Sequence, residues 1–226
     1  MKKSGVKTAG YIGTNDPLGD NFGKVFKQSA QNAGISVIAE ERFNRSDTSV
    51  VAQALRLKLA APDAILVGAA GATTVLPQVT LFDQGYGGKL YQTHGAGTPD
   101  FIKLGGKRVE KTLMAASPML VLGEIGNDVA SKPVAQRYID AYKKMYGHEP
   151  GIFGANVFDA GLLLEATIPI AAKSAKPGTP EFRAALRDAL GSDPGRMQLM
   201  ERGGLFSKND RGNVYDKFRD RVMFPI

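Results

Sequence analysis

Residues 8–34 read TAGYIGTNDPLGDNFGKVFKQSAQNAG, and this stretch decides the fold class. Its first six residues are typical of a buried strand, and the turn NDPLG follows them. Apolar side chains then recur at helical spacing between Leu18 and Ala33, and Gly34 is a typical residue for ending a helix. Strand, turn and amphipathic helix form the first half of a βαβ unit.

The same alternation continues through the first half of the chain. Further strands are expected at residues 35–38, 64–67, 90–93 and 112–115. Helices are expected at residues 46–59, with a cap at Ser46, Asp47 or Thr48, and at residues 75–82. On the first of these helices, Val51, Leu55 and Leu59 are predicted to share the buried face. This order favours a parallel α/β sheet.

The pattern changes after the strand at residues 112–115. Three helices are expected without strands between them, over residues 135–145, 158–172 and 180–190. A strand pair is expected to return from residue 205, with the turn NDRG at residues 209–212. Because the three helices have apolar faces and no sheet of their own, these faces need a partner. Either they pack on the sheet half, or part of their natural partner is missing. In the second case we expect a homodimer or strand exchange through the helices of residues 132–190.

Composition excludes several classes of protein. The chain has 226 residues, no cysteine, and a net charge of +7 from 29 basic and 22 acidic residues. The basic residues are scattered, so no nucleic-acid partner is expected. Without cysteine there is no disulfide, thiolate nucleophile or cysteine metal site. No apolar run reaches the roughly 18 to 20 residues that span a bilayer, and SGVK follows MKK where a signal peptide would be apolar, so no export signal is expected.

Catalytic motifs are not found either, and we predict no enzyme, cofactor or metal. The segment GAAGAT at residues 68–73 lacks the spacing of a dinucleotide fingerprint. His94 and His148 lie far apart in the sequence, and no serine stands in a nucleophile elbow. Glu40 and Glu41 are adjacent, so on a strand they point to opposite faces.

An ordered set of motifs resembles the type I periplasmic solute-binding proteins of the leucine/isoleucine/valine-binding kind. NDPLG is similar to the family's Asp-Tyr-Gly turn at the ligand cleft, and FDA at residues 158–160 is similar to its Tyr-Asp-Ala. The likeness extends over residues 1–8, 63–95 and 205–214 as well. It implies a periplasmic binding protein type I-like α/β fold, with a Rossmann-like lobe and an incomplete second lobe.

The resemblance also implies a domain division and a partner. Lobe two is expected at residues 5–122 and 203–226, with the closing hairpin, and residues 128–200 are expected to be the helical remnant of lobe one. An ABC-transporter substrate-binding protein in the periplasm, working with the transporter's membrane subunits, is implied. Family members begin with half of lobe one and a signal peptide, so we expect an N-terminally truncated chain with weak affinity on its own.

Ligands collect outside the carboxyl ends of strands in doubly wound sheets. Four segments are expected there, at residues 15–19, 68–73, 94–97 and around 152–156. For Gly68, Gly71, Gly95 and Gly97, turn geometry with positive φ and close approach of a ligand both remain open. The candidate ligand-binding residues are Asn15, Asp16, Leu18, Gly19, Ala70, Gly71, Ala72, Thr73, His94, Gly95 and Phe153.

Three of these positions bear on the ligand. In amino-acid-binding members, the loop that matches His94 supplies a carboxylate for the ligand's ammonium group, and an imidazole cannot replace it. Leu18 and Ala70 stand where the family places tyrosines. We therefore expect a small carboxylate with an apolar or aromatic body, an aromatic or 2-keto acid rather than a branched-chain amino acid. Two alternatives for the function of the chain remain, the effector domain of a regulator or receptor and a Rossmann-like nucleotide-dependent enzyme. For His94 itself, the alternative is a loop residue with no contact to a ligand.

Overall fold

The computed structural model describes residues 1–129, 131–191, 224 and 225. The chain divides into two compact units, one of residues 1–116 with 223–226 and one of residues 117–222. The predicted lobe boundary at residues 122–128 lies near this division, and the assignment of lobes stays a prediction. The expected hairpin at residues 205–214 lies outside the described residues.

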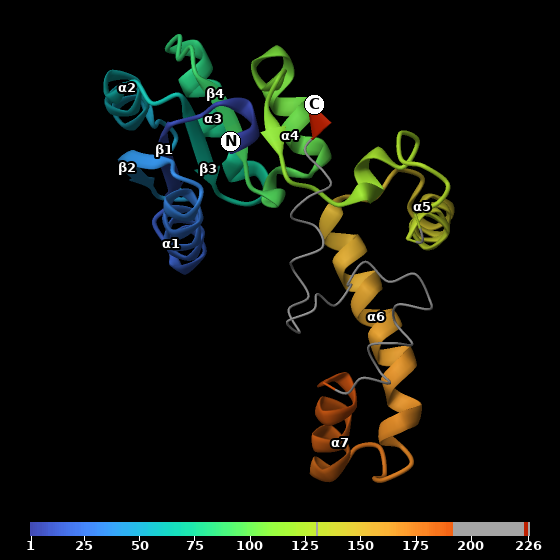
Figure 1. Ribbon diagram of the computed structural model, residues 1–226. Helices are drawn as coiled ribbons and strands as arrows, with labels where there is room; N and C mark the ends of the chain where they lie inside the picture. The colour runs from blue at the N-terminus through green and yellow to red at the C-terminus, as the bar shows by residue number, and fades with distance from the viewer. Residues whose placement is uncertain (130, 192–223, 226) are drawn as a thin grey trace. The chain divides into compact units, whose positions relative to one another are not determined.

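A six-stranded sheet organises the first unit, in the order β2-β1-β3-β4-β5-β6 (Figure 1). The first five strands are parallel, and β6 pairs with β5 in the antiparallel direction. The strands are β1 Thr8–Thr14, β2 Ser36–Phe43, β3 Ala64–Gly68, β4 Lys89–Gln92, β5 Leu113–Met114 and β6 Phe224–Pro225. The predicted parallel α/β sheet is confirmed.

Helices cover both faces of this sheet. Helix α1 (Pro17–Asn32) packs on one face, where Ala30 and Phe26 meet Ala9 and Tyr91. The other face is covered by α2 (Val51–Ala60) and α3 (Val75–Asp83), which bury the larger apolar cluster. That cluster consists of Ile12, Phe43, Val50, Ala54, Leu57, Ile65, Val67, Ala69 and Leu81.

The predicted cap and buried face of α2 are wrong. The helix begins after Val50 with no side-chain cap, so Ser46, Asp47 and Thr48 precede it. Val51, Leu55 and Leu59 are exposed, while Val50, Ala54 and Leu57 are fully buried. The segment VVAQALRLKLA is apolar on several sides, so spacing alone leaves the rotation of the helix open.

Strand β2 confirms the expected alternation of its two glutamates. Glu40 forms an ion pair with Lys27 of α1, whose Nζ lies 2.7 Å from Oε2. Glu41 forms an ion pair with Arg56 of α2, whose Nε lies 2.7 Å from Oε1. Because α1 and α2 cover opposite faces, the two carboxylates point to opposite sides of the sheet.

Several helical segments between β3 and β5 were not expected from the sequence, among them one α-helix and two 3-10 turns. Helix α4 (Pro99–Gly105) begins with Pro99 and buries Phe101 against Val75 and Val109. Short 3-10 turns η2 (Gly71–Thr74) and η3 (His94–Ala96) follow β3 and β4 directly. Both turns lie at the carboxyl ends of their strands.

The second unit is helical in its described part. It contains the 3-10 turn η5 (Pro118–Val121), α5 (Lys132–Tyr146), α6 (Ile152–Ala171) and α7 (Pro180–Gly191). Met119, Tyr138 and Ala155 belong to its apolar cluster. By length and composition, α6 is the single helix of the described residues that could cross a membrane, a test that core helices of soluble proteins also pass. The three predicted helices are confirmed, with α6 beginning six residues earlier than expected.

Candidate ligand-binding site

The turn after β1 is built around the carboxylate of Asp16. Asp16 caps α1 by accepting a hydrogen bond from the Gly19 backbone at 2.9 Å, and it accepts the Thr14 hydroxyl at 2.9 Å. Arg45 donates from Nε to Oδ2 of Asp16 at 2.6 Å. The Gly19 N–H and then these side-chain donors lower the pKa of Asp16 to about 2. Asp16 is therefore an ionised helix cap.

Gly19 has a packing reason that is independent of any ligand. A Cβ at this position would overlap the Thr14 carbonyl. The Gly19 carbonyl accepts the Tyr11 hydroxyl at 2.5 Å. Helix α1 thus begins in close contact with β1, which fixes the direction in which Leu18 and Phe22 leave the turn.

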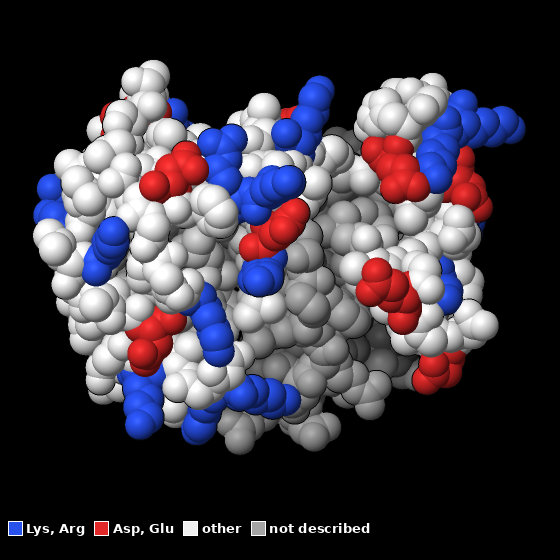
Figure 2. Space-filling model, turned by 90° about the horizontal axis from the view of Figure 1, so that it is seen from above, with Lys and Arg blue, Asp and Glu red and all other residues white. Residues whose placement is uncertain are grey.

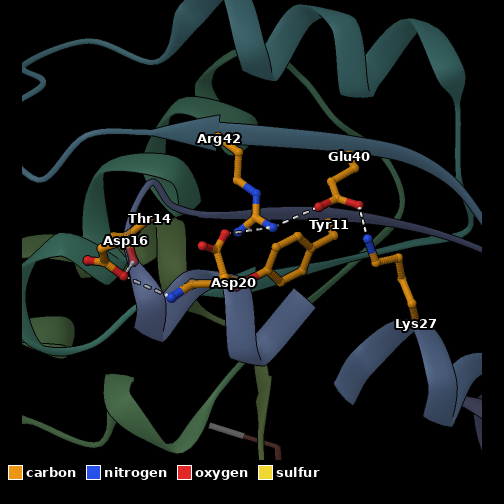
Figure 3. A network of polar contacts seen from close by, with 8 residues as sticks. Tyr11, Thr14, Asp16, Asp20, Lys27, Glu40 and Arg42 are labelled. Carbon is orange, nitrogen blue, oxygen red and sulfur yellow. Dashed lines mark hydrogen bonds and ion pairs between the residues drawn. The ribbon is translucent and has the colours of Figure 1, made fainter. Parts of the chain in front are cut away.

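A charged network on the α1 side holds β1, β2 and α1 together (Figure 3). Glu40 lies between Lys27 and Arg42, and Arg42 also contacts Asp20. The Arg42 guanidinium lies 5.1 Å from the centre of the Tyr11 ring. Burial raises the pKa of Tyr11 to about 12, so Tyr11 stays a neutral hydrogen-bond donor. The network supports the first turn of the site.

The loops after β3 and β4 are tied to each other. The Thr93 hydroxyl donates to the Ala69 carbonyl at 2.8 Å. A Cβ on Gly95 would lie 2.5 Å from that same carbonyl and 2.8 Å from the Cα of Ala70. The structure therefore brings Gly95 and Ala70 into close contact. Thr73 closes the β3 loop by donating to the Ala70 carbonyl at 2.8 Å.

The glycines at this edge have different roles. Gly71 has φ of 64°, and a Cβ there would meet open space, so backbone conformation requires glycine. A Cβ on Gly68 would overlap the Tyr11 ring, and Gly95 is limited by contact with Ala69 and Ala70. Gly68, Gly95 and Gly97 do not have positive φ, so the expectation that turn geometry requires glycine at these three positions is wrong.

His94 is exposed at the start of η3 and faces an aromatic ring of α1. Its ring centre lies 6.0 Å from that of Phe22, with the planes 73° apart, an edge-to-face contact. Leu18 lies one turn before Phe22 on α1, so both side chains leave the same face of the helix. Sequence reasoning missed Phe22; its spacing of four from Leu18 was the available signal.

Arg45 is a second residue that sequence reasoning missed. It follows β2, the neighbour of β1 in the sheet, and it is half exposed beside Asp16. Asn15 also contacts this loop, because its amide donates to Oδ1 of Asn44 at 3.2 Å. The carboxyl ends of β1, β2, β3 and β4 thus carry the candidate site. Ala72 lies exposed in η2 at the same edge.

Phe153 is placed in the other compact unit. It lies in the first turn of α6 and is exposed. The other ten candidate residues belong to the first unit, where the structure brings them to one edge of the sheet.

The larger of the two described cavities lies at the opposite, amino-terminal edge of the sheet. It measures about 600 Å³ and includes Asp63, Tyr86 and Lys89 in its wall. Its lysines already serve the backbone, because Lys58 donates to Gln84 and Lys89 to Ser4, each at 2.7 Å. The candidate residues of the first unit lie instead at the carboxyl edge, where the loops after β1, β2, β3 and β4 converge, and open α/β sheets bind ligands at that edge.

Charges of both signs lie side by side on the face seen in Figure 2. Among the described residues, no group of three or more His, Asp or Glu could hold a metal ion.

Open, doubly wound α/β sheets form a class of proteins that commonly bind ligands at the edge where these loops gather. The periplasmic binding protein family matches residues 1–212, and the chain belongs to this family. An extracellular ligand-binding receptor from Rhodopseudomonas palustris is 45% identical, with a TM-score of 0.79, and the match covers 84% of this chain and 53% of that one. The expected periplasmic binding protein type I-like fold of this chain is confirmed.

Two more distant structures show the fold alone. A leucine-binding protein from Thermotoga maritima is 21% identical, with a TM-score of 0.71, over 94% of this chain and 56% of that one. A solute-binding protein of an ABC transporter from R. palustris, in complex with benzoate, is 17% identical, with a TM-score of 0.70. The match covers 94% of this chain and 54% of that one.

The chain spans about half the length of the solved relatives that it matches. A separate match of 23 residues, 10% of this chain, is 74% identical to a DNA primase from Haemophilus influenzae. It covers 4% of that protein, which is too short to show a family.

Proposed function

We propose that this chain is the larger part of a solute-binding receptor that carries a small carboxylate with an apolar or aromatic body to an ABC transporter in the periplasm. The chain acts by binding and not by catalysis. In this mechanism two lobes close over the ligand, and the closed form is presented to the membrane subunits. The carboxyl edge of the sheet is one wall of the ligand site.

The contact between His94 and Phe22 carries the ligand assignment. The rings of Phe22 and His94 and the side chain of Leu18 provide apolar surface beside the loops at the carboxyl ends of β1, β3 and β4. An aromatic or aliphatic ligand body gains free energy by covering such surface. The benzoate of the R. palustris solute-binding protein has this chemistry and is compatible with the proposal.

The charges of the same loops argue against a free amino acid. In residues 15–19, 44–48, 68–74 and 93–98, the carboxylates are those of Asp16 and Asp47. Asp16 already caps α1 and pairs with Arg45, and Asp47 accepts the backbone N–H of Asn44 at 2.8 Å. An α-ammonium group would therefore meet no free carboxylate on this wall. Arg45 engages Asp16 through Nε, and its two terminal nitrogens remain suited to a ligand carboxylate.

A thermal-shift titration of the chain tests this function. Benzoate and phenylpyruvate should raise the melting temperature, because a ligand that binds only the native state stabilises it by mass action. Benzamide, the neutral analogue of benzoate, should give a smaller shift. Greater stabilisation by leucine or valine than by either acid would contradict the ligand class.

The chain's two histidines provide a matched pair of variants. His94→Ala should reduce the shift caused by benzoate, because it removes one member of the edge-to-face pair. His148→Ala is the control, because His148 lies exposed after α5 in the other unit. Equal loss from both variants would remove His94 from the site.

We also propose that the exposed apolar stripe of α6 is covered by a second copy of the chain. Phe153, Val157, Leu164 and Ile168 are all exposed and follow helical spacing along one side of α6. Large exposed apolar patches usually mark contact surfaces. Light scattering should show a dimer that Val157→Glu converts to a monomer; a compact monomer at high concentration would contradict the dimer.

A further inference from the structure

Two buried polar side chains of the helical unit border one small cavity. Tyr138 of α5 is 7% exposed and Asp159 of α6 is 3% exposed. The Tyr138 hydroxyl and Oδ2 of Asp159 have no hydrogen-bond partner among the described residues. Buried polar atoms in native proteins nearly always have a partner. Each group therefore requires a partner that the described residues do not supply.

The cavity has the size of a single small molecule. Its volume is about 10 Å³, close to the space that one water molecule requires. The remaining wall is mostly apolar and consists of Met119, Ser131, Val134, Ala135, Ala155 and Phe158.

The position of the Tyr138 hydroxyl is set by its surroundings. The ring lies 5.0 Å from Phe158 and 5.9 Å from Tyr142, measured between ring centres. A Cβ on Gly154 would overlap the hydroxyl, so α6 accommodates it only because residue 154 is glycine. The hydroxyl is thus held between the two helices rather than turned toward solvent.

We propose that Tyr138 and Asp159 bind one internal water molecule between α5 and α6. In this arrangement the Tyr138 hydroxyl donates to the water, and the water donates to Oδ2 of Asp159. Ser131 supplies a third polar group in the wall. This site is independent of the proposed ligand site, because all its residues belong to the helical unit.

Water fits this cavity better than a cation does. Hard cations take six or more oxygen ligands, and only three oxygen-bearing side chains line the wall. The neighbouring basic side chains are engaged elsewhere: Lys132 donates to the Ile125 carbonyl at 2.7 Å, and Arg137 lies 5.7 Å from the centre of the Phe158 ring.

A crystal structure of the full chain at a resolution that shows ordered water tests the proposal. We expect one density peak within hydrogen-bonding distance of both the Tyr138 hydroxyl and Oδ2 of Asp159. A direct Tyr138–Asp159 hydrogen bond or a cavity without density would overturn it. This result does not depend on any variant folding.

A double-mutant cycle provides the second test. Tyr138→Phe and Asp159→Asn should have non-additive effects on the unfolding midpoint, because each removes a partner of the same water. Tyr142→Phe is the control, one turn further along α5, and its effect should add to that of Asp159→Asn. Additive effects of Tyr138→Phe and Asp159→Asn would overturn a shared water.

Discussion

Arg45 Nε lies 2.6 Å from Oδ2 of Asp16, so the loop after β2 is attached to the cap of α1. The Asp16 carboxylate also accepts the Gly19 N–H and the Thr14 hydroxyl. This one side chain holds together the turn from which Leu18 and Phe22 reach the candidate site. Its removal should affect both stability and ligand binding.

Asp16→Ala should lower the free energy of unfolding by about 1 kcal/mol, the usual cost of losing a helix cap. Chemical denaturation of the variant and the parent measures it. Asp100→Ala is the matched control, an exposed acid in the first turn of α4, where the expected change is a few tenths of a kcal/mol. Equal changes in the two variants would show that Asp16 does not act as a cap.

The stabilisation from Asp16 should disappear in acid. Its pKa is about 2 in the folded chain and 3.8 as the ordinary value, so the folded state favours the ionised form. The contribution is fully present above pH 4 and is lost as the pH falls toward 2. The difference in melting temperature between the parent and Asp16→Asn should therefore shrink over that range. A constant difference from pH 5 to pH 2 would contradict this linkage.

Asp159 should show the opposite dependence on pH. Burial raises its pKa to about 6 from 3.8, so the folded state favours the protonated form. The parent should lose stability as the pH rises from about 4 through 6, by on the order of 3 kcal/mol if the shift is fully expressed. Asp159→Asn should therefore gain stability over the parent at pH 8 relative to pH 4. Chemical denaturation followed by circular dichroism at both values measures this gain, and its absence would show that Asp159 is well solvated.

Gly95→Ala should disturb the contact between the loops after β3 and β4. The added methyl group would meet the Ala69 carbonyl and Ala70, which costs about 1 to 3 kcal/mol for overpacking. Gly87→Ala is the control, because a Cβ there meets nothing within 4 Å. Thermal unfolding should separate the two variants. Equal melting temperatures would mean that the β4 loop yields without cost.

Phe22→Ala should weaken binding of benzoate, because it removes the ring that faces His94 and apolar area that the ligand would cover. A loss of about tenfold corresponds to roughly 1.4 kcal/mol. Phe82→Ala is the control, a half-exposed phenylalanine near the end of α3. Calorimetric titration measures both, and unchanged affinity in Phe22→Ala would exclude it from the site.

Most of the sheet could be predicted from the sequence, because buried strands such as residues 64–67 are short apolar runs between turn residues. Gly34 follows the last residues of α1 with a φ of 72°, so it ends this helix as predicted. The buried face of α2 could not be predicted, because Val50 and Val51 are equally apolar and only packing against Ile12 and Ile65 selects between rotations.

The candidate site was predictable in part for a related reason. Loops that follow strands can be located from the chain order, so His94 and Asp16 were found. Phe22 and Arg45 were missed, because one comes from a helix face and the other from a loop at the neighbouring strand. Their proximity to His94 and Asp16 depends on strand order, which local spacing does not encode.

Strand β2 is at the end of the sheet order, so one of its sides has no neighbouring strand among the described residues. Unpaired strand edges tend to recruit strands from other molecules, and charged side chains oppose this. Glu40 with Lys27 and Glu41 with Arg56 place ion pairs above and below that edge. These pairs should protect the chain from edge-to-edge aggregation on this side during folding and at high concentration.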